Sequence, residues 1–246
     1  MPKIRELIRE GKGKRVYATE NPEEAVVYFK DEAMAYRGLK RGRIVGKGEV
    51  NNAVCNYIFS FLANRGIENH FIRRLDPRQS LIRRVDILPF SVTVRNRIAG
   101  SLAERLGKKI GTKLVSPVIE FTMKDVETED PLINETHMIA LGMATHAEVA
   151  EISKMALRVN QLLKDLFSEI DIDLVDIKLE FGRWKGRVIL ADEISPDSAR
   201  FWDASTMEPL GIDRFRRDMD NVEQAYQELL HRMMGMEETC AESSHS

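Results

Sequence analysis

The chain has 246 residues, which is enough for one large domain or for two lobes with a sizeable core. Its 37 basic and 39 acidic residues give a net charge of −2, which argues against a general nucleic-acid-binding protein. Two cysteines without zinc-ligand spacing, a polar N-terminal segment and no run of about 18 apolar residues predict a cytoplasmic protein that is not in a membrane.

The first predicted element is a hairpin with strands over residues 14–19 and 25–29, joined by the turn-forming sequence ENPE. It opens with the glycine-rich, basic sequence GKGKRVY at residues 11–17. The sequence lacks the spacing of a P-loop, and a strand follows it where a dinucleotide-binding turn has a helix. A hairpin that covers nucleotide phosphates, as in kinases, fits it better, and a solvated basic turn is the alternative.

A helix is predicted over residues 52–64, followed by strands around 71–74, 81–85 and 91–95. The sequence VRNRIAGS at 94–101 then places arginine, asparagine and serine side chains where a strand gives way to a helix. Ser101 is the expected helix cap, and arginines beside a helix N-terminus favour an anion site. Surface arginines beside an ordinary cap are the alternative.

The second half begins with a capping box, Thr145 and Glu148, and helical spacing of apolar residues continues to about residue 170. A hairpin with strands 173–181 and 187–194 follows, joined by a turn at 183–186, and the last predicted helix covers 222–234. Strands, helices, a hairpin and a final helix in this order predict an α+β fold with mostly antiparallel sheets.

The hairpin carries the most distinctive charge pattern. Side chains alternate between the two faces of a strand, so Asp176, Lys178 and Glu180 share one face. The apolar residues Val175, Ile177, Leu179 and Phe181 are expected on the other. Asp192 ends the partner strand, where it could approach Lys178 or Asp176. Carboxylates on adjacent strands beside a lysine could hold Mg²⁺ and a nucleotide phosphate, whereas cross-strand ion pairs on a half-exposed sheet are the alternative.

The loop that follows, DEISPDSARFWD at 192–203, is polar although it continues a buried strand. Loops that a rigid strand positions are favoured places for function. Arg200 could bind a phosphate and Ser195 and Asp197 could orient a substrate, while an ordinary turn is the alternative. The five histidines have no ligand spacing, which argues against a zinc site.

Six of these motifs occur together in a fixed order between about residues 10 and 235: GKGKRVY, VRNRIAGSL, DPLIN, VDIKLEFG, LADEISPDSARFWD and DRFRRD. In this the chain resembles the SAICAR synthetase family of purine biosynthesis. The resemblance implies a ligase that uses ATP and Mg²⁺ to join L-aspartate to carboxyaminoimidazole ribotide (CAIR), giving SAICAR, ADP and phosphate.

The family fold implies a kinase-like antiparallel N-terminal lobe over residues 1–88 and a larger, ATP-grasp-like lobe over 89–236, with 237–246 expected as a polar flexible tail. A homodimer is a further expectation. By resemblance, the ATP phosphates contact Lys12, Gly13 and Lys14, and Mg²⁺ binds Glu180 and Asp192. The resemblance also implies that CAIR binds Arg95, Ser101 and Arg200, that Asp176 and Lys178 act near the reacting carboxylate, and that Asp130 lines the cleft. Ser195 and Asp197 are expected to bind the substrate from the composition of their loop.

One stretch departs from the family pattern. Met34 and Arg37 stand where the family usually has a hydroxyl residue and an aspartate or asparagine, so no substrate contact is expected from residues 31–38. Two functions from other classes also fit the nucleotide motifs: a small-molecule kinase that stops at phosphoryl transfer, and a non-catalytic nucleotide-binding module.

Overall fold

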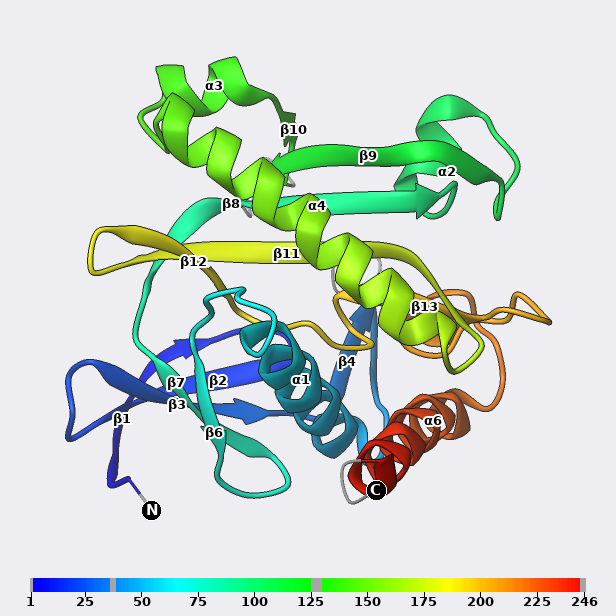
Figure 1. Ribbon diagram of the computed structural model, residues 1–246, viewed down its shortest axis with the longest axis horizontal. Coiled ribbons are helices and arrows are strands. Elements are labelled where there is room, and N and C mark those ends of the chain that lie inside the picture. Colours follow the sequence, from blue (N-terminus) through cyan, green and yellow to red (C-terminus); the bar gives the residue numbers. More distant parts are fainter. Residues whose placement is uncertain (1, 36–38, 125–129, 244–246) are drawn as a thin grey trace.

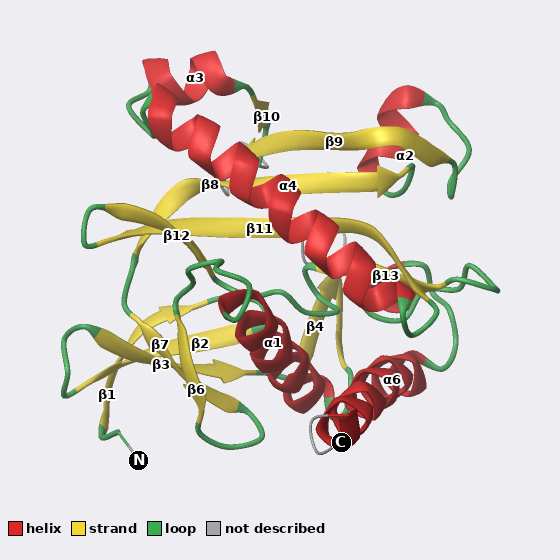
Figure 2. Cartoon of the chain, in the orientation of Figure 1, coloured by secondary structure: helices red, strands yellow, loops and turns green. Residues whose placement is uncertain are grey.

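The computed structural model describes residues 2–35, 39–124 and 130–243, which form two large antiparallel β-sheets, a separate two-stranded pair, and helices packed against the sheets (Figure 1, Figure 2). Every pairing between the named strands is antiparallel, which confirms the predicted mixture of helices with antiparallel sheets. No helix among the described residues is long and apolar enough to cross a membrane.

The smaller sheet contains the glycine-rich hairpin. Its strand order is β1-β2-β3-β7-β6, and the predicted pairing of β2 with β3 is confirmed. Strand β1 was not predicted; it lies at the sheet edge with all seven residues exposed, so it has no buried face to give a periodic signal. The bounds are β1 (Ile4–Glu10), β2 (Lys14–Thr19), β3 (Glu24–Phe29), β6 (Phe71–Arg74) and β7 (Gln79–Arg83), with β4 (Glu32–Ala35) and β5 (Lys40–Arg43) as a separate pair.

The larger sheet has the order β10-β9-β8-β11-β12, and β13 pairs with one end of β11. The division expected after residue 88 falls inside β8, which is a continuous strand of twelve residues. Strands β9 and β13 were not predicted, and β13 occupies the end of the loop expected over 192–203. The bounds are β8 (Asp86–Arg97), β9 (Lys113–Met123), β10 (Leu132–Ile133), β11 (Ile172–Trp184), β12 (Arg187–Ala191) and β13 (Ala199–Asp203).

The central hairpin of this sheet, β11 and β12, is tighter than predicted. Only Lys185 and Gly186 separate the paired residues Trp184 and Arg187, and both have positive φ, as a two-residue hairpin turn requires. A register shift between Leu174 and Asp176 also interrupts the alternation. Val175 therefore packs with Ala99 and Trp202 in a separate small cluster, so its predicted place in the same apolar row as Ile177 is wrong.

The longer helices pack against the two large sheets and bury apolar residues between them. In Figure 1, α4 crosses the larger sheet, and α6 lies beside α1 next to the smaller one. The predicted capping box of Thr145 and Glu148 is confirmed at the start of α4, whereas α1 begins five residues before the predicted start at Asn52. The bounds are α1 (Lys47–Ala63), α2 (Ser101–Leu106), α3 (Glu135–Ala140), α4 (His146–Ser168), α5 (Ile212–Arg216) and α6 (Val222–Ser243).

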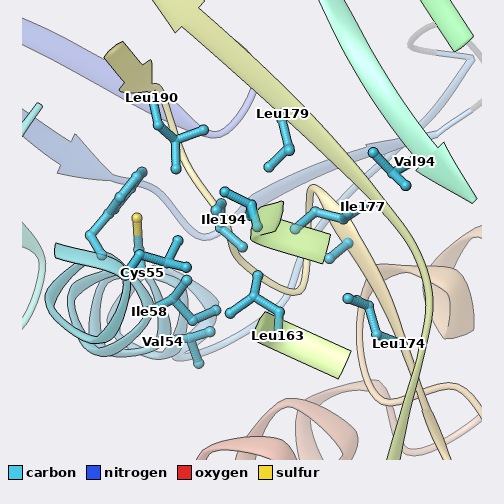
Figure 3. Close-up of a cluster of buried hydrophobic side chains, with 14 of the residues drawn as sticks. Val54, Cys55, Ile58, Val94, Leu163, Leu174, Ile177, Leu179, Leu190 and Ile194 are labelled. Carbon is cyan, nitrogen blue, oxygen red and sulfur yellow. The ribbon is translucent and has the colours of Figure 1, made fainter. Parts of the chain in front are cut away.

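Helix α6 continues through residues 237–243, where a separate polar tail was expected, and residues 244–246 lie outside the described part of the chain. Its apolar side contributes to a single large core. Figure 3 shows that Val54 and Ile58 of α1, Leu163 of α4 and Ile177 of β11 converge in this core, which also holds residues of the smaller sheet. The core therefore fixes both sheets relative to one another and holds the charged residues of β11 at a set place.

Candidate active site

The glycine-rich hairpin brings one lysine against the end of the larger sheet. Lys14, the first residue of β2, has its ammonium 2.7 Å from Asp192 and 2.9 Å from Glu193. Burial opposes the charged form, but these two carboxylates outweigh it and raise the pKa of Lys14 above its usual value. Lys12 is exposed in the turn before β2, where it is accessible to a ligand.

Asp192 directly follows β12 and turns the chain, with a left-handed φ of 64°. Burial would raise its pKa, but Lys14, with smaller contributions from Lys178 and Lys124, lowers it to about 2. The carboxylate is therefore ionised at neutral pH and can serve as a ligand for a cation. It lies near Lys178 as the sequence predicted, whereas the predicted alternative partner, Asp176, is held elsewhere by arginines.

Glu180 lies beside Asp192, and we call these two carboxylates the acidic group. Its Cα pairs with that of Ala191, the residue before Asp192, and its oxygens lie 2.5 Å from the Lys124 ammonium and 3.2 Å from that of Lys178. Because Lys124 and Lys178 also lower the pKa of Asp192, Glu180 and Asp192 share one electrostatic environment. Cations thus already neutralise both carboxylates.

The donor chemistry of this acidic group suits Mg²⁺, which prefers carboxylate oxygens and often takes one or two of them together with phosphate oxygens and water. Glu180 and Asp192 are the residues that could hold it. Among the described residues, no three histidine, cysteine or acidic side chains form a group that could enclose a metal by themselves. A cation here would therefore need ligands from a bound phosphate or from water.

A second charged group lies along β11 from Glu180. The Asp176 carboxylate is buried between two guanidinium groups, 3.1 Å from Arg95 and 2.8 Å from Arg200. Arg95 also donates to Glu120 at 2.6 Å and to the Ser101 hydroxyl at 3.2 Å. Both predicted substrate arginines are thus brought to one place, where the buried Asp176 carboxylate orients them.

The backbone of α2 begins next to Arg95 and Arg200, which we call the arginine group. The predicted cap at Ser101 is wrong: Gly100 is the N-cap of α2, and no side chain caps this helix. Gly100 has a φ of 50°, and a Cβ there would lie 2.5 Å from Nη2 of Arg200. On its far side Arg200 donates to Asp213 at 2.8 Å, a residue that the sequence analysis did not select.

Arg97 belongs to a different contact. Its guanidinium donates to Asp173 and, at 3.0 Å, to the Gly111 carbonyl oxygen. In the pairing of β8 with β9, a register shift separates the pair of Arg97 with Lys113 from that of Arg95 with Val118. The arginine group therefore comprises Arg95 and Arg200.

Ser195 and Asp197, the two predicted residues of the loop after β12, form hydrogen bonds with other residues of the protein. Ser195 is completely buried, and its hydroxyl donates to Glu193 at 2.7 Å and accepts from the Asp197 backbone at 3.2 Å. Asp197 accepts from Lys47 and from Tyr226, both at 2.6 Å. Ser195 shapes the loop, and Asp197 lies beside Gly13 of the hairpin.

Asp130 is exposed with a φ of 52°, directly after residues 125–129, which lie outside the described part of the chain, as does Arg37 of the atypical segment. Several residues that the sequence analysis did not select contact the predicted ones, among them Lys47, Lys124, Glu193, Asp213 and Tyr226. Glu193 and Asp213 were within quoted motifs. The other three contact their partners across long sequence separations, and only the fold reveals those contacts.

Comparison with known proteins agrees with the motif order. The family model described as SAICAR synthetase matches residues 7–233. A phosphoribosylaminoimidazole-succinocarboxamide synthase of Clostridium botulinum is 49% identical over 93% of this chain and 97% of its own length. The namesake from Brevibacillus brevis is 49% identical, with 94% and 97% covered.

Solved structures agree with these relatives. The phosphoribosylaminoimidazole-succinocarboxamide synthase of Ehrlichia chaffeensis superposes with a TM-score of 0.91 and 39% identity, covering 93% of this chain and 98% of that one. A SAICAR synthetase in complex with ADP has a TM-score of 0.90 and 40% identity, covering 94% and 98%. The motifs, the sequence match and the fold agree, and the chain belongs to the SAICAR synthetase family.

Proposed function

We propose that this protein is the ATP-dependent ligase that joins L-aspartate to the carboxylate of CAIR in purine biosynthesis, releasing SAICAR, ADP and phosphate. Membership of the family supports this assignment, as does the structure of a relative described as a complex with ADP. The observation that carries it is the placement of Asp176, Lys178 and Glu180 at alternate positions of β11. They connect the arginine group at one end with the acidic group at the other.

The spacing of these residues suits two anionic substrates that must meet. Residues two apart on a strand are separated by about 7 Å. Lys178 therefore lies between Asp176, which holds Arg95 and Arg200, and Glu180 of the acidic group. Its side chain is 48% exposed, so its ammonium is accessible to a ligand. It is suited to screen a carboxylate that approaches a triphosphate.

The proposed ligand contacts follow from these two groups. Lys12, Gly13 and Lys14 bind the ATP phosphates, and Glu180 and Asp192 hold Mg²⁺, which would screen phosphate charge. Arg95, Ser101 and Arg200 bind the phosphate and ribose of CAIR, and Asp176 acts near the reacting carboxylate. Asp130 lines the cleft, and Ser195 and Asp197 position the substrate through the loop that they stabilise.

In the proposed mechanism, a carboxylate oxygen of CAIR attacks the γ-phosphorus of ATP, and ADP leaves. The resulting acyl phosphate has a good leaving group, whereas the carboxylate itself does not. The aspartate amine then attacks the acyl carbon and loses a proton, and inorganic phosphate departs with one oxygen of the original carboxylate. The chain contributes chiefly by positioning the reactants and by stabilising charge.

Several finer features belong to this proposal. The smaller sheet corresponds to a kinase-like lobe, and the larger sheet with its helices corresponds to an ATP-grasp-like lobe, with the nucleotide between them. A cytoplasmic location follows from the metabolic role of the family. A homodimer is the proposed assembly, and it can be checked by light scattering.

An omission assay tests the proposed function. The complete mixture contains CAIR, aspartate and MgATP, and each component is left out in turn while SAICAR and ADP are both measured. A ligase forms the two products in equal amounts and needs every component. ADP release that does not depend on aspartate would identify a small-molecule kinase, and ATP binding without ADP in any mixture would identify a nucleotide-binding module.

A further inference from the structure

The Asp197 carboxylate lies at a buried junction with Lys47 and Tyr226, two residues to which the proposed reaction assigns no role. Its Oδ2 accepts from the Lys47 ammonium and its Oδ1 from the Tyr226 hydroxyl, each at 2.6 Å. The Lys47 side chain is 0% exposed, and Tyr226 is 1% exposed. We call these three residues the Asp197 junction. Both carboxylate oxygens are thus bound by side chains from inside the protein.

The Asp197 junction joins four segments that are distant in the sequence. Lys47 is the first residue of α1, Asp197 lies in the loop between β12 and β13, and Tyr226 is in α6. The fourth segment is the glycine-rich hairpin. A Cβ on Gly13 would lie 3.5 Å from Oδ2 of Asp197 and 3.6 Å from Nζ of Lys47, so the space between the hairpin backbone and the junction is only wide enough for a methyl group.

Neighbouring contacts connect the junction to Lys14, so the position of Gly13 also affects that of Lys14. The Gly13 carbonyl oxygen accepts from the Lys30 backbone at 2.8 Å, and the next residue, Lys14, pairs with Asp192 and Glu193. Loop residue Ser195 binds both Glu193 and the Asp197 backbone. The junction and the acidic group are therefore two ends of one loop, and the hairpin contacts both ends.

The chemistry of the junction argues against a role in stability alone. A buried ion pair commonly gives less stability than apolar side chains of similar volume, because desolvating both charges is costly. One turn further along α1, the buried Oδ1 of Asn51 has no hydrogen-bond partner among the described residues. Buried polar groups of this kind restrict the positions of their neighbours, so the junction is suited to fix the position of the Asp197 carboxylate.

We propose that Lys47 and Tyr226 are positioning residues that hold Asp197, and through it the Gly13 backbone, where the hairpin binds the nucleotide phosphates. Helix α6 then takes part in nucleotide binding although it contributes no ligand contact of its own. The inference rests on the proposed use of the hairpin as the ATP phosphate site. It assigns the junction to the nucleotide and not to CAIR or aspartate.

The test removes one hydroxyl. Tyr226→Phe keeps the ring and the packing but removes the donor to Asp197, and Tyr57→Phe is the matched control. Tyr57 is a residue of α1 that contacts α6, where its hydroxyl is 4.0 Å from the Met236 sulfur and does not bind Asp197. The measurements are the KM values of the three substrates, the Kd of MgADP by calorimetry, and the melting temperature.

The expected result for Tyr226→Phe is an increase of about tenfold in the KM of MgATP and the Kd of MgADP, the factor that corresponds to about 1.4 kcal/mol. The KM values of CAIR and aspartate stay within about twofold, and Tyr57→Phe changes none of these constants. Lys47→Met, which keeps most of the side-chain length, is expected to weaken nucleotide binding by a larger factor.

Two results would overturn the inference. One is a lower melting temperature of Tyr226→Phe with unchanged MgADP binding, which would make the junction an anchor for α6 only. The other is an equal increase in the KM of all three substrates, which would indicate general loosening. MgADP binding needs no ligase turnover, so if the wild type binds MgADP but forms no SAICAR, the proposed function fails and the inference is still tested.

Discussion

Gly100 and Arg200 approach each other so closely that the glycine has no room for a side chain. A Cβ would lie 2.5 Å from Nη2 of Arg200, and the φ of Gly100 is 50°. We expect Gly100→Ala to displace the Arg200 guanidinium and to raise the KM of CAIR about tenfold or more, as loss of a charged ligand contact does. The KM of MgATP should not change.

Gly107→Ala is the matched control for this substitution. Gly107 also has a positive φ, 58°, but a Cβ there would meet nothing within 4 Å. It should lower stability by about 1 kcal/mol through backbone strain and leave the KM of CAIR unchanged. If Gly100→Ala and Gly107→Ala changed the KM of CAIR equally, the contact between Gly100 and Arg200 would have no specific role in CAIR binding.

Much of the fold could be predicted from the sequence because its strongest signals are local. The capping box of α4, the apolar spacing that follows it, and the alternation in β11 all depend on residues close in the sequence. Strands β1 and β9 lack such a signal, since none of their residues is buried. The irregular register at Leu174 and Asp176 depends on strand pairing, which no local pattern encodes.

The site divides in the same way. Charged residues within one motif, such as Asp176 and Glu180, could be selected from their spacing. The ion pair of Lys47 with Asp197 spans 150 positions, and that of Lys124 with Glu180 joins the end of β9 to β11. Such contacts result from packing, so the sequence analysis identified one partner and missed the other.

Lys178 and Asp192 provide the test of charge stabilisation in the reaction. Lys178 is 48% exposed, so its removal should leave the fold intact. We expect Lys178→Ala or Asp192→Asn to lower kcat by roughly 100-fold or more, because losing such a contact costs about 2–4 kcal/mol in the transition state. Lys185→Ala, at the exposed turn of the same hairpin, is the control and should retain normal turnover. Near-normal kcat in both site variants would contradict these assignments.

Glu180 provides the test of the proposed Mg²⁺ site. Removing its charge leaves Asp192 as the remaining proposed carboxylate ligand. The Mg²⁺ concentration that gives half-maximal turnover should therefore rise about tenfold or more in Glu180→Gln, as for loss of a direct metal ligand. Glu148→Gln is the control, since Glu148 pairs with Arg183 at the start of α4. An unchanged Mg²⁺ requirement in Glu180→Gln would exclude Glu180 as a ligand.

The Glu148–Arg183 pair predicts a pH dependence of stability. Arg183 donates to both Glu148 oxygens, at 2.6 and 3.1 Å, and chiefly this contact lowers the pKa of Glu148 to about 2. A depressed carboxyl pKa contributes stability above the unfolded value, near 4.5, and this contribution is lost as the pH falls towards 2. Solvent screening limits it to about 1 kcal/mol.

Glu148→Gln isolates this charge, because glutamine can still accept the capping hydrogen bond from the Thr145 backbone. Urea unfolding at pH 7 should give a variant about 1 kcal/mol less stable than the wild type. The difference should shrink as the pH is lowered below 4.5. A difference that is the same at pH 7 and pH 3 would mean that the ion pair does not cause it.

The central claim is that this chain activates the CAIR carboxylate by phosphorylating it for attack by the aspartate amine. The most direct test uses CAIR labelled with ¹⁸O in that carboxylate, with unlabelled ATP and aspartate, followed by mass analysis of the inorganic phosphate. The account predicts one ¹⁸O atom in each phosphate released. Phosphate without ¹⁸O, formed together with SAICAR, would contradict it.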